Sequence, residues 1–201
     1  MRAELLSWTP LRVLGEALGK ELSEEELLPH LAFTFAVEGV SRACSHQLVR
    51  HRAASFSQQS QRYVPVRRLA ERVVTPASVE GVGLDIFRSL VEASGEAYLK
   101  LVERGVPRED ARFVLPNAVG TDLLVTMDGG SLLHFFGLRC CSRAQWEIHD
   151  LADLMLAEAR RAEAGLFRGA GPYCFQLGRC PEGRFSCGRM REVAERYGGG
   201  L

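Results

Sequence analysis

Two short runs of branched and aromatic residues most constrain how this chain can fold. Leu31–Val37 lies between a proline and a glycine, and Gly120–Met127 stops shortly before a glycine pair, so each run predicts a β-strand. Arg2–Trp8 alternates loosely enough to predict a further strand. Helical patterns cover most of the remaining chain, at about residues 11–19, 41–52, 78–104, 107–115, 129–138 and 142–164.

The connections between these elements carry weaker signals. Ser23 and Glu26 have the spacing of a capping box, which predicts a short helix before Pro29. Residues 53–61 are polar and predict a loop, and residues 63–66 predict an extended stretch. Residues 170–201 are rich in glycine and cysteine with weak periodicity, so we expect an irregular C-terminal segment. A length of 201 residues without internal repeats or a linker predicts one domain.

Positive charge is concentrated in one segment, although the formal net charge of the chain is zero. Residues 39–70 contain no Asp or Glu, but they contain six arginines and two histidines. Arginine pairs bidentately with phosphate, so this segment predicts a site for a phosphorylated ligand. The balanced total argues against a protein whose whole surface binds nucleic acid. The arginines are Arg42, Arg50, Arg52, Arg62, Arg67 and Arg68, and the histidines are His46 and His51.

Six cysteines occur without a signal-peptide pattern, which indicates a reducing compartment. No apolar run approaches the roughly 18 residues of a membrane span, so we expect a cytoplasmic protein that does not bind a membrane. The cysteine spacings match none of the short zinc-ligand patterns well, so we expect no bound metal and free structural thiols. A structural metal site is the alternative, built from Cys174, Cys180 and Cys187 with Cys140 or Cys141.

The densest polar feature is the segment from Arg50 to Arg62, which reads RHRAASFSQQSQR. It offers a basic helix end followed by hydroxyl and amide side chains that can hydrogen-bond phosphates and base edges. No glycine-rich dinucleotide or phosphate-loop motif occurs, so a flavin or nicotinamide needs a different binding mode. A solvated basic helix end is the alternative interpretation of the arginines alone.

The RHR triplet, with seven residues between Arg52 and Ser60, resembles the RHRx7S signature of the flavin-dependent thymidylate synthases. The flanking segments at 38–49 and 138–148 are also similar to that family, and the resemblance runs from about His30 to Arg160. It implies an α+β fold, with a small central antiparallel sheet flanked by long helices in a single domain over residues 1–201.

The resemblance also implies an activity. Members of the family convert dUMP to dTMP, with 5,10-methylenetetrahydrofolate as the carbon donor and reduced FAD, regenerated by NADPH, as the hydride source. They work as homotetramers with active sites between subunits, and neither nucleic acid nor membrane is a partner. The implied FAD contacts are Glu26, Arg50, His51, Arg52, Gln58, Asp128, Gly129, Gly130 and His134. The implied dUMP contacts are Gln47, Leu48, Val49, Arg50, Gln58, Gln59, Ser60, Gln61, Arg62, Arg112 and Arg139.

Arg139 is the implied catalytic residue, and its role has a physical basis. Uracil C5 is a poor nucleophile until negative charge develops across N3 and O4. Arginine stays protonated, so it cannot serve as a base, but paired hydrogen bonds from it stabilise that charge. Ser60 has no local base partner and is assigned to binding rather than to covalent attack. Two alternatives remain open, namely a flavin- and nucleotide-binding homologue without synthase activity and a non-enzymatic nucleotide- or RNA-binding module.

Overall fold

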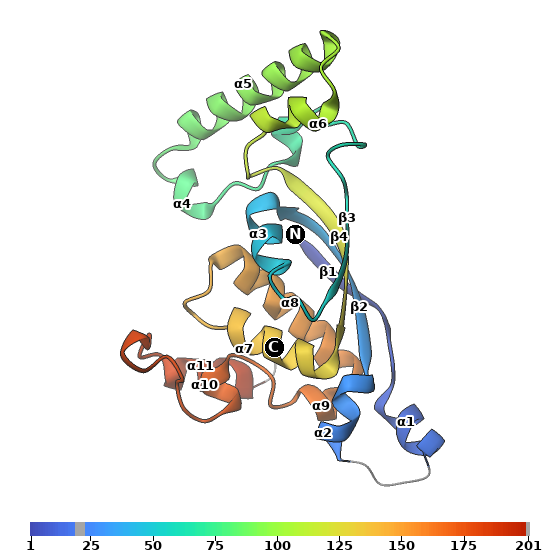
Figure 1. The fold of residues 1–201 in the computed structure, drawn as a ribbon. Coiled ribbons are helices and arrows are strands. Elements are labelled where there is room, and N and C mark those ends of the chain that lie inside the picture. The colour runs from blue at the N-terminus through green and yellow to red at the C-terminus, as the bar shows by residue number, and fades with distance from the viewer. Residues whose placement is uncertain (19–22, 200–201) are drawn as a thin grey trace. The chain divides into compact units, whose positions relative to one another are not determined.

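A four-stranded sheet organises the computed structural model, which describes residues 1–18 and 23–199. The strands are antiparallel and lie in the order β1, β2, β4, β3 (Figure 1). This small sheet among helices confirms the predicted α+β class. The strands span Arg2–Trp8 (β1), Ala32–Ser41 (β2), Ser55–Gln58 (β3) and Gly120–Asp128 (β4).

Contacts divide the chain into two compact units, and the prediction of one domain stays a prediction. The first unit contains residues 1–37, 47–56 and 124–201, and the second contains residues 38–46 and 57–123. Strands β2, β3 and β4 and helix α3 (Arg42–Leu48) each contribute residues to both units.

In the first unit, α8 (Trp146–Ala162) packs against β1 and α7 (Gly129–Arg139). Its apolar side is fully buried because Ile148, Leu151 and Met155 recur at helical spacing. The other helices of this unit are α1 (Leu11–Leu18), α2 (Glu24–Leu27), η1 (Leu28–His30), α9 (Ala164–Phe167), α10 (Tyr173–Gln176), η4 (Gly183–Phe185) and α11 (Met190–Gly198).

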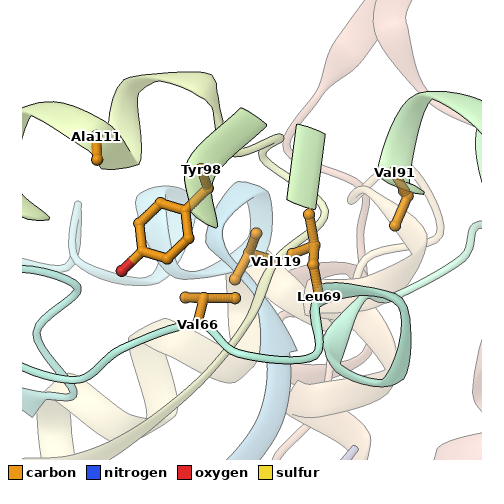
Figure 2. Close-up of a cluster of buried hydrophobic side chains, with 6 residues drawn as sticks. All are labelled: Val66, Leu69, Val91, Tyr98, Ala111 and Val119. Atoms are coloured by element: carbon orange, nitrogen blue, oxygen red, sulfur yellow. The ribbon is translucent and has the colours of Figure 1, made fainter. Parts of the chain in front are cut away.

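In the second unit, α5 (Leu84–Glu103) lies beside α6 (Arg108–Ala111) and covers η2 (Leu69–Arg72) (Figure 1). Two short helices, α4 (Ala77–Glu80) and η3 (Arg112–Val114), complete the unit. The hydroxyl of Tyr98 is buried in the core without a hydrogen-bond partner. Figure 2 shows the buried side chains of this core, which are Val66, Leu69, Val91, Tyr98, Ala111 and Val119.

Several predicted boundaries were wrong. The helix that begins after Ser41 ends at Leu48 rather than at residue 52, because the next residues form tight turns that bring His51 inward. The polar loop contains β3. Of the stretch predicted to be extended at residues 63–66, Tyr63 belongs to a turn over residues 61–63 and Val64 to a bend. Gly81 and Gly83 separate α4 from α5 within the long helix predicted from residue 78.

The last long helix, α8, begins after Gln145 rather than after Ser142, because the Gln145 side chain accepts the hydrogen bond from the Ile148 amide. The C-terminal segment predicted to be irregular contains α10 and α11, because Val193 and Tyr197 bury one side of α11. Within the described part of the chain, no helix is both long enough and apolar enough to cross a membrane.

Candidate functional site

The start of α7 sets the position of several predicted site residues. Asp128 caps this helix, since its carboxylate accepts hydrogen bonds from the Ser131 amide (2.8 Å) and hydroxyl (2.6 Å). A Cβ at Gly129 would lie 2.9 Å from Leu28 Cδ2 and 3.1 Å from the Leu28 carbonyl oxygen, so a larger residue there would have to displace Leu28. The FAD contacts expected of Asp128, Gly129 and Gly130 stay predictions.

The RHR triplet and α7 surround one cavity, which we name the arginine cavity. It has a volume of about 220 Å3 and brings together five predicted site residues. Because no carboxylate lines it, its electrostatic character favours an anionic ligand. The lining residues are Arg50, His51, Arg52, Ala53, Ala54, Met127, Ser131, His134, Leu138 and Arg139.

Arg139 and His51 form the central contact of the arginine cavity. Arg139 Nε donates a hydrogen bond to His51 Nε2 at 2.9 Å, and Arg139 Nη2 donates to the Gln47 carbonyl at 3.4 Å. Burial, together with the charges of Arg139 and His134, lowers the pKa of His51 to about 4. His51 is therefore neutral at pH 7 and carries its proton on Nδ1. The lone pair on Nε2 accepts the hydrogen bond from Arg139 and so orients the guanidinium group.

Two aromatic residues support the histidines of the cavity. The His51 ring packs edge to face on Phe135, with ring centroids 5.0 Å apart. His134 Nδ1 is hydrogen-bonded to the hydroxyl of Tyr173 in α10. The Tyr173 ring also covers Gly137, where a Cβ would lie 2.7 Å from Tyr173 Cε1. Tyr173 was not predicted as a site residue because it lies in the segment without a periodic pattern.

The predicted residues at the end of α3 have different surroundings. The Gln47 amide donates to Gln145 Oε1 at 3.4 Å, which connects α3 to the start of α8. The Leu48 side chain is fully buried in the core, whereas Val49 is exposed. Gln145 belongs to the segment that resembles the family, but its contact with Gln47 joins residues 98 positions apart.

The remaining predicted dUMP contacts lie in the second unit. Gln58 Nε2 donates to Thr121 Oγ1 at 3.2 Å, which fixes its amide. Arg62 forms an ion pair with Glu109 at 2.7 Å, and Arg112 Nε donates to the Glu109 carbonyl at 3.0 Å. Gln59, Ser60 and Gln61 line one small cavity with Val64, Val66, Arg72, Val119, Gly120 and Thr121.

Arg42 is a candidate that the sequence analysis did not assign to the site. Burial and the neighbouring charge of Arg112 lower the pKa of its guanidinium group. Two guanidinium groups that repel each other favour an anion between or beside them. The signal was present in the sequence, because Arg42 is the first arginine of the acid-free segment.

Glu26 and the cysteines take part in other structures. The capping box is confirmed, since Glu26 Oε2 accepts from the Ser23 amide (2.9 Å) and hydroxyl (2.7 Å), and these bonds lower the pKa of Glu26. A second cavity, of about 320 Å3, is lined by Cys141, Cys174, Cys180 and Cys187. In residues 1–18 and 23–199, no three His, Cys, Asp or Glu side chains form an arrangement that could hold a metal ion.

Comparisons with known proteins identify relatives of this chain. A family model described as "Thymidylate synthase complementing protein" matches residues 15–163. The flavin-dependent thymidylate synthase of Geobacter sulfurreducens is 53% identical over 174 residues, which cover 86% of this chain and 75% of that protein. The protein of the same name from Clostridium tetani is 39% identical over 226 aligned positions, which cover 97% and 90%.

A solved structure shares the fold. Thymidylate synthase X from Helicobacter pylori, crystallised with FAD and dUMP, aligns with a TM-score of 0.68 at 23% identity, over 83% of this chain and 97% of that chain. The sequence resemblance and the α+β fold are thus confirmed. This chain belongs to the family of flavin-dependent thymidylate synthases.

Proposed function

We propose that this protein makes dTMP from dUMP by reductive methylation, with 5,10-methylenetetrahydrofolate as the carbon donor. The observation that carries the proposal is the Arg139 guanidinium group, which neutral His51 holds in the cavity of the RHR triplet. The relatives named above carry this activity in their names, and the Helicobacter pylori structure contains FAD and dUMP.

The residues of the arginine cavity fit FAD. Arg50 and Arg52 can pair with its diphosphate, and the cavity lacks a carboxylate that would repel it. Leu138 is exposed and offers apolar surface to a flat ring, beside His51 and His134. When bound and reduced by NADPH, FAD supplies the hydride of the reaction.

Arg139 activates the uracil in this proposal. His51 accepts from Nε and Gln47 accepts from Nη2, so the plane of the guanidinium group is set before a ligand arrives. A preset cation stabilises the negative charge that develops at N3 and O4 without having to reorganise. Arg139 remains protonated throughout, and no thiolate or serine of the chain attacks the base.

Cations of the second unit bind the phosphate of dUMP in this proposal. Arg42 and Arg112 repel each other, so a phosphate dianion relieves an existing electrostatic cost. Arg62 is exposed in its ion pair with Glu109 and can exchange that partner for phosphate. Gln59, Ser60 and Gln61 add uncharged hydrogen-bonding groups.

We also propose that the chain works as a homotetramer with active sites between subunits. Val82 lies in the turn before α5, and Ile86 and Leu90 follow at four-residue spacing in the first turns of that helix; the three are 90%, 71% and 61% exposed. Such an apolar row on a helix is typical of a surface that another subunit covers. The six free cysteines fit a reducing compartment, which supports the cytoplasm as the location.

The test measures dTMP formation by the purified protein after reconstitution with FAD. We expect product only when dUMP, methylenetetrahydrofolate and NADPH are all present, and a yellow preparation with flavin absorbance bands. A protein that binds FAD but forms no dTMP would support the homologue without synthase activity. Nucleic-acid affinity that falls steeply with salt, without flavin binding, would instead support the nucleic-acid-binding module.

A further inference from the structure

The C-terminal end of α7 has a support that the proposed reaction does not yet use. The last carbonyl groups of a helix lack intrahelical donors, and a helix end without other partners frays. Here His149 Nδ1 lies 3.2 Å from the Arg139 carbonyl oxygen. The Tyr197 hydroxyl lies 3.1 Å from the next carbonyl, that of Cys140. His149 from α8 and Tyr197 from α11 therefore contact the backbone carbonyl groups of Arg139 and Cys140.

Both donors converge on one carboxylate, that of Asp153. The Tyr197 hydroxyl lies 2.7 Å from Asp153 Oδ1, so it shares its one proton between this carboxylate and the Cys140 carbonyl. His149 Nε2 lies 3.5 Å from Asp153 Oδ2. Arg196 forms an ion pair with the same carboxylate. The His149 and Asp153 side chains are only 15% and 12% exposed, so solvent screens these contacts weakly.

The orientation of the His149 ring follows from its two neighbours. One ring nitrogen faces the Arg139 carbonyl and the other faces the Asp153 carboxylate, so both neighbours are hydrogen-bond acceptors. The Arg139 carbonyl can only accept, so the Nδ1 that faces it carries a proton, and the carboxylate attracts Nε2 in the ring form that is protonated at both nitrogens. In that form Asp153 turns the ring so that Nδ1 points at Arg139. The guanidinium group of Arg139 is held through Nε by His51, and the backbone carbonyl of Arg139 is held by His149.

We propose that His149 is a positioning residue for Arg139 and is itself oriented by Asp153. Because Arg196 and Tyr197 of α11 contact Asp153, α11 contributes to catalysis from outside the site. This inference rests on the proposed function only through the reaction that Arg139 assists. The guanidinium group must meet the uracil edge closely, and a displacement of about 1 Å can cost on the order of 100-fold in rate. Loss of the His149 contact lets the last turn of α7 fray and moves that group.

Two substitutions of His149 distinguish the roles of its two ring nitrogens. In His149→Asn the side-chain amide occupies the place of Nδ1 and still donates to the Arg139 carbonyl, whereas in His149→Gln the amide occupies the place of Nε2. We expect His149→Gln to lower kcat for dTMP formation by about 10- to 100-fold, and His149→Asn to stay within a few-fold of wild type. His30→Gln serves as the control, since His30 is exposed.

Two further measurements do not depend on turnover. His149→Gln should weaken dUMP binding to the FAD-loaded protein and speed amide hydrogen exchange in the last turn of α7, while His149→Asn should do neither. Equal effects of both variants on all three measurements, or no effect of either, would overturn the inference. If wild type forms no dTMP, the proposed function fails, and dUMP binding and hydrogen exchange still decide the role of His149.

Discussion

Acid should destabilise the wild-type protein more than a His51→Gln variant, because folded His51 resists protonation. Its pKa is about 4 instead of 6.5, chiefly because the ring is buried and secondarily because Arg139 and His134 are close. Below pH 6.5 the unfolded chain binds a proton at this residue that the folded chain does not bind. The free energy of unfolding therefore falls as the pH drops from 6.5 to 4, and this contribution is fully lost below pH 4.

The size of the effect follows from the two pKa values. A difference between 6.5 and about 4 corresponds to at most about 3–4 kcal/mol, since one pKa unit is worth about 1.4 kcal/mol, and about 3 kcal/mol of it falls between pH 7 and pH 4. Glutamine at position 51 keeps an acceptor for Arg139 Nε but cannot titrate. The wild-type protein should thus lose up to about 3 kcal/mol more than His51→Gln between pH 7 and pH 4.

Urea unfolding at half-unit steps between pH 7 and pH 4 measures this difference directly. The contributions of other titrating groups to the free energy of unfolding cancel when one stability curve is subtracted from the other. A His30→Gln variant, which alters an exposed histidine, should follow the wild-type curve. Parallel curves for wild type and His51→Gln would refute the conclusion that His51 is held neutral.

Three further outcomes test the packing around the site. Tyr98→Phe should raise the free energy of unfolding by about 1 kcal/mol, because it removes a buried hydroxyl without a partner; a lower melting temperature would contradict this. Gly129→Ala should destabilise by about 1–3 kcal/mol in thermal unfolding, because its Cβ would meet Leu28, whereas Gly15→Ala has open space and should not destabilise. Under native conditions a thiol reagent should modify Cys141, Cys174, Cys180 and Cys187 before buried Cys44 and Cys140, as mass spectrometry of the labelled peptides would show.

The parts of the fold that the sequence predicts are those with a buried face. The strands at residues 31–37 and 120–127 carry branched and aromatic side chains that are buried in the sheet, so their pattern is visible locally. Strand β3 reads Ser-Phe-Ser-Gln and is strand only because it pairs with β4. Helix α11 was missed because its two buried anchors, Val193 and Tyr197, give a weak period in a glycine-rich segment.

The candidate site also contains features that the sequence predicts and features that only the tertiary structure shows. The RHR triplet and Arg139 are visible because each belongs to a local motif that resembles the family. The pairing of Arg139 with His51 joins residues 88 positions apart, and no spacing in the sequence indicates it. The support of Arg139 by His149 and Asp153 likewise depends on how α7, α8 and α11 pack, which is a tertiary property.

Tritium release from dUMP labelled at C5 tests the central role of Arg139 most directly. The protein reconstituted with FAD, and supplied with NADPH and methylenetetrahydrofolate, should release tritium. Arg139→Ala should release it about 100- to 1000-fold more slowly while it still binds flavin. Arg143→Ala, which alters an arginine of the same motif outside the arginine cavity, should release it at the wild-type rate. Release by Arg139→Ala within a few-fold of wild type would contradict the assignment of uracil activation to this residue.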